Sequence, residues 1–270
     1  MKTPLDLQKI RGMMLQLYHV TGAGHYFDEP DVRIAAADDV WFQKYKTVIG
    51  DFHWTPAEAL QRKFPGAQAK SVISWVIPVK ESIRLANRKE SEFPAVPWAA
   101  MRSFGELENE TMGRQLCMLL QNYGYAAVSP HLEQMQTDYK LTDNHYASHW
   151  SERHIGFVAG HGTFGLSAGL ITEHGVAIRL GSVVTDLELP ATERAYGDDP
   201  WEWCTKCGAC MKRCPAHAVG MTPADRDKHA CAFYQVEKVL QDRAEKYGWM
   251  QLNLGCGLCQ TAVPCEFKRP

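Results

Sequence analysis

The cysteines are the residues whose type and spacing best suit a chemical role, and eight of the nine follow residue 203. The first four form the run Cys-x2-Cys-x2-Cys-x3-Cys-Pro, which begins at Cys204 and ends at Cys214 and Pro215. With this spacing three thiolates wrap one 4Fe–4S cluster, and the fourth reaches toward a second cluster. The run therefore predicts a protein that transfers single electrons.

A second cluster needs further thiolates, and four more cysteines lie downstream with a less regular spacing. Two-cluster proteins exchange one ligand between their cysteine runs, which divides the eight cysteines into two sets. The expected ligands of one cluster are Cys204, Cys207, Cys210 and Cys265. The expected ligands of the other are Cys214, Cys231, Cys256 and Cys259.

Zinc and disulfide bonds are the alternative interpretations of these cysteines. Zinc favours four thiolates in two pairs, and disulfides require an oxidising compartment. Neither calls for eight thiolates at these spacings, so iron–sulfur binding is preferred. The ninth cysteine, Cys117, lies in an apolar run and is expected to be a core residue.

With 270 residues the chain is long enough for a sizeable core ahead of the cysteines. We expect two domains, a cofactor and substrate domain at 1–195 and a cluster domain at 196–270, joined by the Pro-containing linker 190–200. The formal net charge of −2 gives no general attraction to nucleic acid or to an anionic membrane. The N-terminus resembles no signal peptide and no segment is apolar enough to span a membrane, so a cytoplasmic location is expected. Exposed cubanes are oxygen-sensitive, which favours an anaerobic or microaerobic host.

The elements that must position these residues follow from apolar periodicity. Helices are expected where apolar residues recur every three or four positions, at 5–17, 41–49, 105–123 and from about residue 148. Strands are expected at 71–78, 125–128, 176–180 and 182–186, with Gly181 turning the last two into a pair. The segment 21–39 is expected to be a loop. These elements predict a mixed α/β layer.

A glycine-dense stretch at 159–172 invites a cofactor interpretation, because glycines let the backbone approach a ligand closely. It lacks the dinucleotide-binding pattern and a phosphate-binding lysine, and a plain tight turn is an equal alternative. The candidate cofactor-binding residues are Gly160, His161, Gly162, Thr163, Phe164, Gly165 and Leu166.

Histidines and tyrosines crowd just before this stretch. They lack the helical His-Glu-x-x-His pattern of a zinc site, and we interpret them as hydrogen-bonding or proton-donating groups of a pocket, or else as structural residues. The candidate proton donors are Glu106, Tyr139, His145, Tyr146 and His161.

The order of these segments resembles the epoxyqueuosine reductase and reductive dehalogenase superfamily. The likeness covers 69–259 and includes Ala-Lys-Ser-Val-Ile at 69–73, Asn-Tyr-Gly-Tyr-Ala at 122–126 and Ser-Glu-Arg-His at 151–154. The most specific part is Arg-Leu-Gly-Ser-Val-Val-Thr-Asp-Leu-Glu-Leu-Pro at 179–190, followed by the cysteine run. The superfamily's own proton donors are not in place, since Arg-Ser-Phe-Gly-Glu stands at 102–106 where an Asp-Tyr-His motif or a tyrosine would be. The chain also ends five residues after Cys265, so it resembles a divergent member without a helical-repeat extension.

This resemblance implies a nitroreductase-like α/β (α+β) domain that holds a corrinoid, followed by a two-cluster bacterial ferredoxin-like domain. It implies a soluble oxidoreductase in which the clusters pass low-potential electrons to the pocket, where a small-molecule substrate is reduced. Cobalamin is the expected pocket cofactor, with FMN as the alternative. A ferredoxin or flavodoxin is the expected electron donor, and tRNA is not expected as a substrate. The competing hypothesis is an electron-transfer partner or reductive activator of another corrinoid protein.

Overall fold

The computed structural model describes residues 2–133, 140–142, 145–248 and 255–270. A four-stranded antiparallel sheet with the order β1-β2-β8-β3 lies at its centre. Its strands are β1 (Asp31–Ala36), β2 (Ser71–Pro78), β3 (Ala127–Val128) and β8 (Ile178–Thr185). Two short antiparallel pairs, β4 (Lys140–Thr142) with β5 (His145–Ala147) and β6 (Gly162–Phe164) with β7 (Leu170–Thr172), lie beside it.

Strand β2 is buried along its whole length, as its continuous apolar run predicts. Because successive side chains of a strand point to opposite faces, Ile73, Trp75 and Ile77 enter one core while Val72 and Val76 enter the other. The central strand therefore links two hydrophobic cores.

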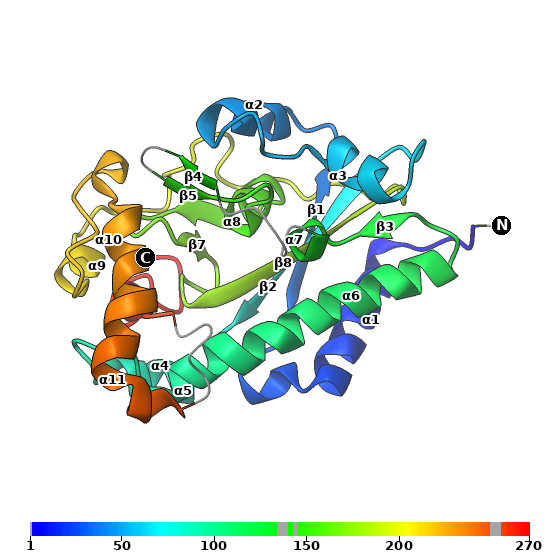
Figure 1. Ribbon diagram of the computed structural model, residues 1–270. Coiled ribbons are helices and arrows are strands. Elements are labelled where there is room, and N and C mark those ends of the chain that lie inside the picture. The colour runs from blue at the N-terminus through cyan, green and yellow to red at the C-terminus, as the bar shows by residue number, and fades with distance from the viewer. Residues whose placement is uncertain (1, 134–139, 143–144, 249–254) are drawn as a thin grey trace.

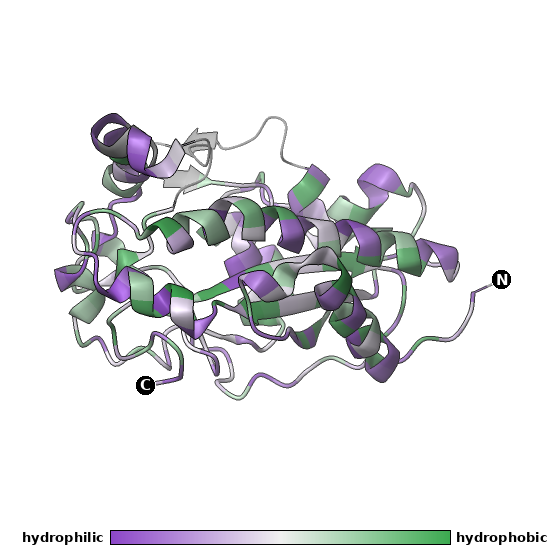
Figure 2. Ribbon diagram, turned by 90° about the horizontal axis from the view of Figure 1, so that it is seen from below, coloured by the Kyte–Doolittle hydropathy of each residue, from purple (hydrophilic) through white to green (hydrophobic). Residues whose placement is uncertain are grey.

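Helices cover both faces of the sheet. The helices α1 (Leu7–Thr21) and α6 (Glu106–Asn122) lie side by side on one face, and their buried side chains join the core of Ile73 (Figure 1). The helices α2 (Val40–Val48), α3 (Pro56–Lys63) and α8 (Glu152–Val158) supply Phe42, Leu60 and Ile155 to the core on the other face. Hydrophilic and hydrophobic residues alternate along these helices, as expected of helices with one face on a core (Figure 2). The fold is a mixed arrangement of helices and sheet, as predicted.

Two expectations about the strands are wrong. The segment expected as a loop contains β1, which pairs with β2 from Asp31 to Ala36. The expected strand pair around Gly181 is the single strand β8, in which Gly181 stands opposite Trp75. A Cβ atom on Gly181 would lie 2.2 Å from the Trp75 ring. The glycine therefore makes room for a tryptophan and makes no turn.

The remaining α-helices of the described chain are shorter than α1 and α6. They are α4 (Glu81–Arg88), α5 (Val96–Ala100), α7 (Pro130–Glu133), α9 (Ala209–Lys212), α10 (Lys228–Phe233) and α11 (Val239–Tyr247). A π-helical turn at Met101–Gly105 joins α5 to α6, so the chain runs as one helical segment from 96 to 122.

The cysteine-rich segment packs directly on the sheet domain. The backbone N–H groups of Val176 and Ala177 donate to the carbonyls of Cys265 and Glu266. Glu266 is buried and forms ion pairs with Arg84 and Arg88 of α4. Across the described parts of the chain, no helix combines the length and apolarity needed to cross a bilayer.

Candidate functional site

Four cysteines from both ends of the cysteine-rich segment meet around one small cavity. This outer thiol set consists of Cys204, Cys207, Cys210 and Cys265. The cavity has a volume of about 20 Å³. Burial raises the pKa of Cys265 to about 12, together with a smaller contribution from the neighbouring thiols Cys210, Cys204 and Cys207, as expected of thiolates that share a site.

The other four cysteines meet at the wall of a larger cavity of about 430 Å³. This inner thiol set consists of Cys214, Cys231, Cys256 and Cys259. Burial, Cys231 and Cys214 raise the pKa of Cys256 to about 12. The structure thus gathers the eight cysteines into the same two sets of four that the sequence predicts as ligands.

Hydrogen-bond donors surround the inner thiol set. Arg226 Nη2 lies 2.9 Å from Cys231 Sγ, and Gln235 Nε2 lies 2.8 Å from the same sulfur. The backbone N–H of Ala218 donates to Cys214 Sγ at 3.3 Å. Such donors, together with the positive charge of Arg226, stabilise thiolates and any anionic cluster bound to them.

The larger cavity lies between the sheet domain and the cysteine-rich segment, and it is partly open. Its sheet-domain wall combines apolar side chains such as Trp98, Trp150 and Ile178 with charged ones. The π-helical turn and the start of α6 bring Arg102 and Glu106 to this wall. π-helical turns occur often at functional sites.

Glu106 is a buried carboxylate held by two arginines. Arg179 Nε lies 2.5 Å from Glu106 Oε2, and Arg102 Nη1 lies 3.3 Å from the same oxygen. Burial by itself raises the pKa of Glu106, but Arg179 and Arg102 outweigh burial and the pKa lies below its usual value. Glu106 is therefore ionised at neutral pH.

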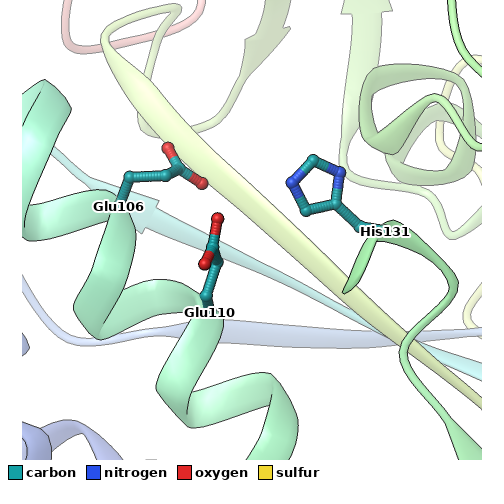
Figure 3. Close-up of side chains that lie close together, drawn as sticks. All are labelled: Glu106, Glu110 and His131. Atoms are coloured by element: carbon teal, nitrogen blue, oxygen red, sulfur yellow. The ribbon is translucent and has the colours of Figure 1, made fainter. Parts of the chain in front are cut away.

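Glu106, Glu110 and His131 turn their side chains toward one another, with ligand atoms within 4.8 Å (Figure 3). Carboxylates and imidazole can bind a divalent cation. The two arginines already neutralise Glu106, however, and they would repel a cation at the same oxygen. This cluster is better suited to hydrogen bonding than to holding a metal.

Glu152, at the start of α8, is the second carboxyl at the cavity wall. Both carboxyl oxygens are shielded from solvent, and neither forms a hydrogen bond with any described residue. The Ser182 hydroxyl and the Trp150 indole lie beside the carboxyl but are hydrogen-bonded to each other at 2.9 Å. Burial raises the pKa of Glu152 to about 8, so its carboxyl carries a proton at neutral pH.

The predicted proton donors do not come together as one group. Glu106 borders the cavity, whereas Tyr139 lies outside the described residues. His145 and Tyr146 form part of β5, where they pair with Thr142 and Leu141. Their roles stay predictions.

His161 lies in the interior rather than at the cavity wall. Its Nδ1 atom is 3.5 Å from Asp31 Oδ2 of β1, and burial lowers the pKa of the imidazole. His149 and His154 also pack inside the fold, where His149 stacks on Trp54 and His154 contacts Ser151. Of the described histidines, His131 borders the cavity.

The predicted cofactor-binding stretch meets the cavities only at its end. Gly162, Thr163 and Phe164 form buried β6, and a Cβ atom on Gly162 would lie 1.8 Å from the Ile171 carbonyl oxygen. Gly165 and Leu166 border the outer cavity, and the four residues after them, 167–170, border the larger one. Close backbone packing explains the glycine at 162, and the role of 160–166 in cofactor binding stays a prediction.

Sequence reasoning missed several charged residues at the larger cavity. They are Glu152, Arg153, Arg226 and Lys228. The first two lie in the 151–154 segment that carries part of the resemblance, which is the one signal that could have singled them out.

Comparison by sequence identifies residues 200–219 as a 4Fe–4S binding domain, which confirms the iron–sulfur prediction for the first cysteine run. No curated protein matches the chain.

Solved structures share its fold at low identity. The catabolic reductive dehalogenase NpRdhA in complex with 3-bromo-4-hydroxybenzoic acid superposes with a TM-score of 0.56 and 14% identity, over 88% of this chain and 30% of that one. A reductive dehalogenase structure described as suggesting a mechanism for B12-dependent dehalogenation gives a TM-score of 0.55 and 14% identity, with the same coverage. Epoxyqueuosine reductase from Streptococcus thermophilus gives a TM-score of 0.51 and 15% identity, over 98% of this chain and 68% of that one.

The chain therefore spans about 30% of the length of the dehalogenases and about two thirds of the epoxyqueuosine reductase. The fold extends across nearly the whole chain, and the 4Fe–4S binding domain lies where the sequence predicts it. The predicted resemblance is confirmed at the level of the fold, which the chain shares with solved structures of a reductive dehalogenase and an epoxyqueuosine reductase.

Proposed function

We propose that the protein is an iron–sulfur oxidoreductase that carries two 4Fe–4S clusters and reduces a small substrate in the larger cavity. The observation that carries this proposal is that the inner thiol set and the cavity share a wall. A cluster on these cysteines would meet a bound molecule without intervening protein. The relatives with the same fold are reductases, which supports an enzyme with this kind of activity.

The arrangement suggests a direction for the electrons. Cys207 of the outer thiol set is exposed, so the outer cluster is the one that a donor such as ferredoxin or flavodoxin would reach. Electrons would then pass to the inner cluster and from there to the cavity. Zinc would satisfy either set of four thiolates alone, but it would give no reason for placing one set beside the other and against a cavity.

A corrinoid is the cofactor that we propose for the cavity, in a nitroreductase-like sheet domain. When bound, it supplies a strongly reducing and nucleophilic cobalt centre. The apolar wall of Trp98, Trp150, Ile178 and Leu180 suits the face of a macrocycle, and because the cavity is partly open it need not enclose the whole molecule. The likeness to a dehalogenase described as B12-dependent supports this choice.

Reductive cleavage of a carbon–oxygen or carbon–halogen bond leaves an anion that must be protonated. Glu152 is the group best prepared for this step, because its buried carboxyl holds a proton at neutral pH. Glu106 is ionised and tied to Arg179, so it is suited to positioning and not to proton donation. Two carboxyls in one site whose pKa values move apart are a common basis for assigning an acid.

The first test is to reconstitute the clusters anaerobically, incubate the protein with cobalamin, desalt it, and measure iron and the visible spectrum. About eight irons per chain with near-stoichiometric corrinoid are expected. A retained yellow chromophore in place of corrinoid would indicate a flavin reductase. About eight irons with neither cofactor would contradict the pocket chemistry and favour an electron-transfer partner or reductive activator.

A further inference from the structure

The larger cavity has a surplus of positive charge. Its charged lining residues are Arg102, Glu106, Glu152, Arg153, Arg179, Arg226 and Lys228. Glu152 is protonated at neutral pH, and Glu106 is shared by Arg102 and Arg179. The remaining three cations face the cavity with no carboxylate partner among the residues that the structure describes.

Arg226 already has hydrogen-bond partners, because it donates to Cys231 Sγ and to the Ala218 carbonyl. Arg153 and Lys228 differ from it. Among the residues that the structure describes, Arg153 donates only to the Ala168 carbonyl, at 2.6 Å, and Lys228 makes no hydrogen bond or ion pair. Arg153 is exposed, and because it borders the cavity this surface can meet a ligand.

These cations are crowded together. Arg226 and Arg179 lie close enough to Arg153 to repel it, and Arg153 and Arg226 likewise repel Lys228. Like charges gathered at a half-buried wall destabilise the fold unless an anion joins them. An oxidised 4Fe–4S cluster on four thiolates would be a dianion, whereas Arg153, Arg226 and Lys228 carry three positive charges, so the cluster alone would not balance the positive charge at this wall.

We propose that the cavity binds an anionic substrate, whose carboxylate or phosphate group is held by Arg153 and Lys228. This inference rests on the proposed function, since it names the substrate class of the same site. The two side chains come from different parts of the cavity wall, Arg153 from α8 of the sheet domain and Lys228 from α10 of the cysteine-rich segment. An anion between them would also hold the two parts of the cavity wall together.

Isothermal titration of the anaerobically reconstituted protein with benzoate, phenyl phosphate and neutral benzamide tests the proposal. At least one anion should bind roughly tenfold or more tightly than benzamide, since a hydrogen bond to a charged group contributes this much. Arg153→Gln and Lys228→Gln should each remove most of that preference and leave benzamide binding unchanged. Lys89→Gln, which removes an exposed lysine away from the cavity, should have no effect. Equal binding of the anions and benzamide, or unchanged preference in both variants, would overturn the proposal.

A second measurement does not depend on the affinity of any one variant. A bound anion opposes the addition of an electron to the nearby inner cluster, so the preferred anion should lower the reduction potential of that cluster in the unmodified protein. Arg153→Gln with full iron content should lose this shift. A potential that does not respond to the anion would contradict binding at this wall.

The anion could instead belong to the cofactor, because cobalamin carries a phosphodiester. Retention of cobalamin and of cobinamide, which lacks that phosphate, separates the two sources. If the site binds a substrate, Arg153→Gln should retain cobalamin and cobinamide equally well. If the variant loses only cobalamin and still binds benzoate and phenyl phosphate as before, the substrate assignment is overturned. If the protein prefers anions but retains no corrinoid, that result would contradict only the proposed corrinoid. The proposed anion site would still be supported.

Discussion

The two glutamates at the cavity wall have pKa values that their surroundings move in opposite directions. Glu106 contacts Arg179 and Arg102 and is ionised, whereas burial raises the pKa of Glu152 to about 8. Both are carboxyls at one wall, so the difference comes from the arginines and not from the residue type. The charges that act on Glu152 are Glu106, which raises its pKa, and Arg179, which lowers it.

Glu152→Gln should change the pH dependence of stability. The folded protein keeps the proton on Glu152 up to about pH 8, whereas the unfolded chain releases it near the usual value for glutamate, so stability falls as pH rises between these values. Glutamine has no proton to lose. Urea unfolding from pH 5 to 9 should therefore show the unmodified protein losing stability relative to Glu152→Gln as pH rises. Parallel stability curves would show that Glu152 is ionised in the folded state, and turnover that falls above pH 8 in the unmodified protein alone would support its role as the acid.

Arg226 should raise the reduction potential of the inner cluster, because its charge and its hydrogen bond to Cys231 Sγ favour the more negative, reduced state. Arg226→Gln should lower that potential by about 60 mV or more, the shift that corresponds to about 1.4 kcal/mol for one electron. A redox titration followed by electron paramagnetic resonance measures it. The outer cluster serves as an internal control and should keep its potential. A uniform shift of both clusters would indicate a general structural change.

At the residue scale the sequence predicts those ligands whose pattern is local. The run at 204–214 can be recognised from its spacing alone, because this spacing suits three thiolates of one loop around one cluster. Glu152 was not singled out, since its pKa depends on burial and on Ser182, Glu106 and Arg179, which only the folded chain brings beside it. His161 seemed suited to a pocket because it stands among glycines, yet Gly162 serves close packing between β6 and β7 and Gly160 packs against the backbone of Glu193.

Among the elements, the turn between Cys256 and Cys259 depends on one glycine. Gly257 has φ 62°, and a Cβ atom there would lie 2.1 Å from the Trp98 ring of α5. Only glycine combines this backbone conformation with such a close approach. The turn therefore places two ligands of the inner thiol set against the sheet domain.

Gly257→Ala should move this turn away from Trp98 and impair the inner cluster. Roughly half of the iron should be lost on reconstitution, because the outer thiol set is untouched. Gly197→Ala is the matched control, since Gly197 has φ 58° but has no atom within 4 Å of the site of a Cβ. It carries the same backbone strain without the clash and should keep its full iron content. Equal iron in both variants would mean that contact with Trp98 does not position the cluster ligands.

The sequence best predicts those helices and strands whose apolar residues follow one clear pattern. Strand β2 and helix α6 are confirmed because a continuous apolar run and a helical repeat each fit one structure. The strand pair predicted around Gly181 is wrong. In the sequence, a glycine that lies opposite a tryptophan within a strand cannot be told from a glycine in a turn. Strand β1 was missed because the flanking Gly, Asp and Pro residues obscure its short alternating pattern.

At the scale of the whole molecule, the end of the chain returns to the sheet domain. Residues 256–266 supply cysteines to both thiol sets and then pair with the backbone of Val176 and Ala177. The sequence predicts domains at 1–195 and 196–270 but not this return, because the contacts join residues far apart in the chain. Assembly of the clusters and docking of the two parts should therefore be coupled.

Glu266→Gln tests this coupling. The Glu266 side chain is 1% exposed, with Arg84 Nη1 at 3.1 Å, Arg88 Nε at 2.7 Å and the Ala262 N–H at 2.8 Å. Removing the charge leaves two arginines without their buried partner, which should destabilise the folded protein by about 3 kcal/mol. Because Glu266 follows Cys265 directly, the outer cluster should lose iron faster to a chelator.

Glu188→Gln, which changes an exposed glutamate, is the control for loss of one negative charge. A single urea transition that shifts together with iron release would show that the two parts unfold as one unit. Early loss of iron with the sheet domain's transition unchanged would show that the cysteine-rich segment can detach by itself.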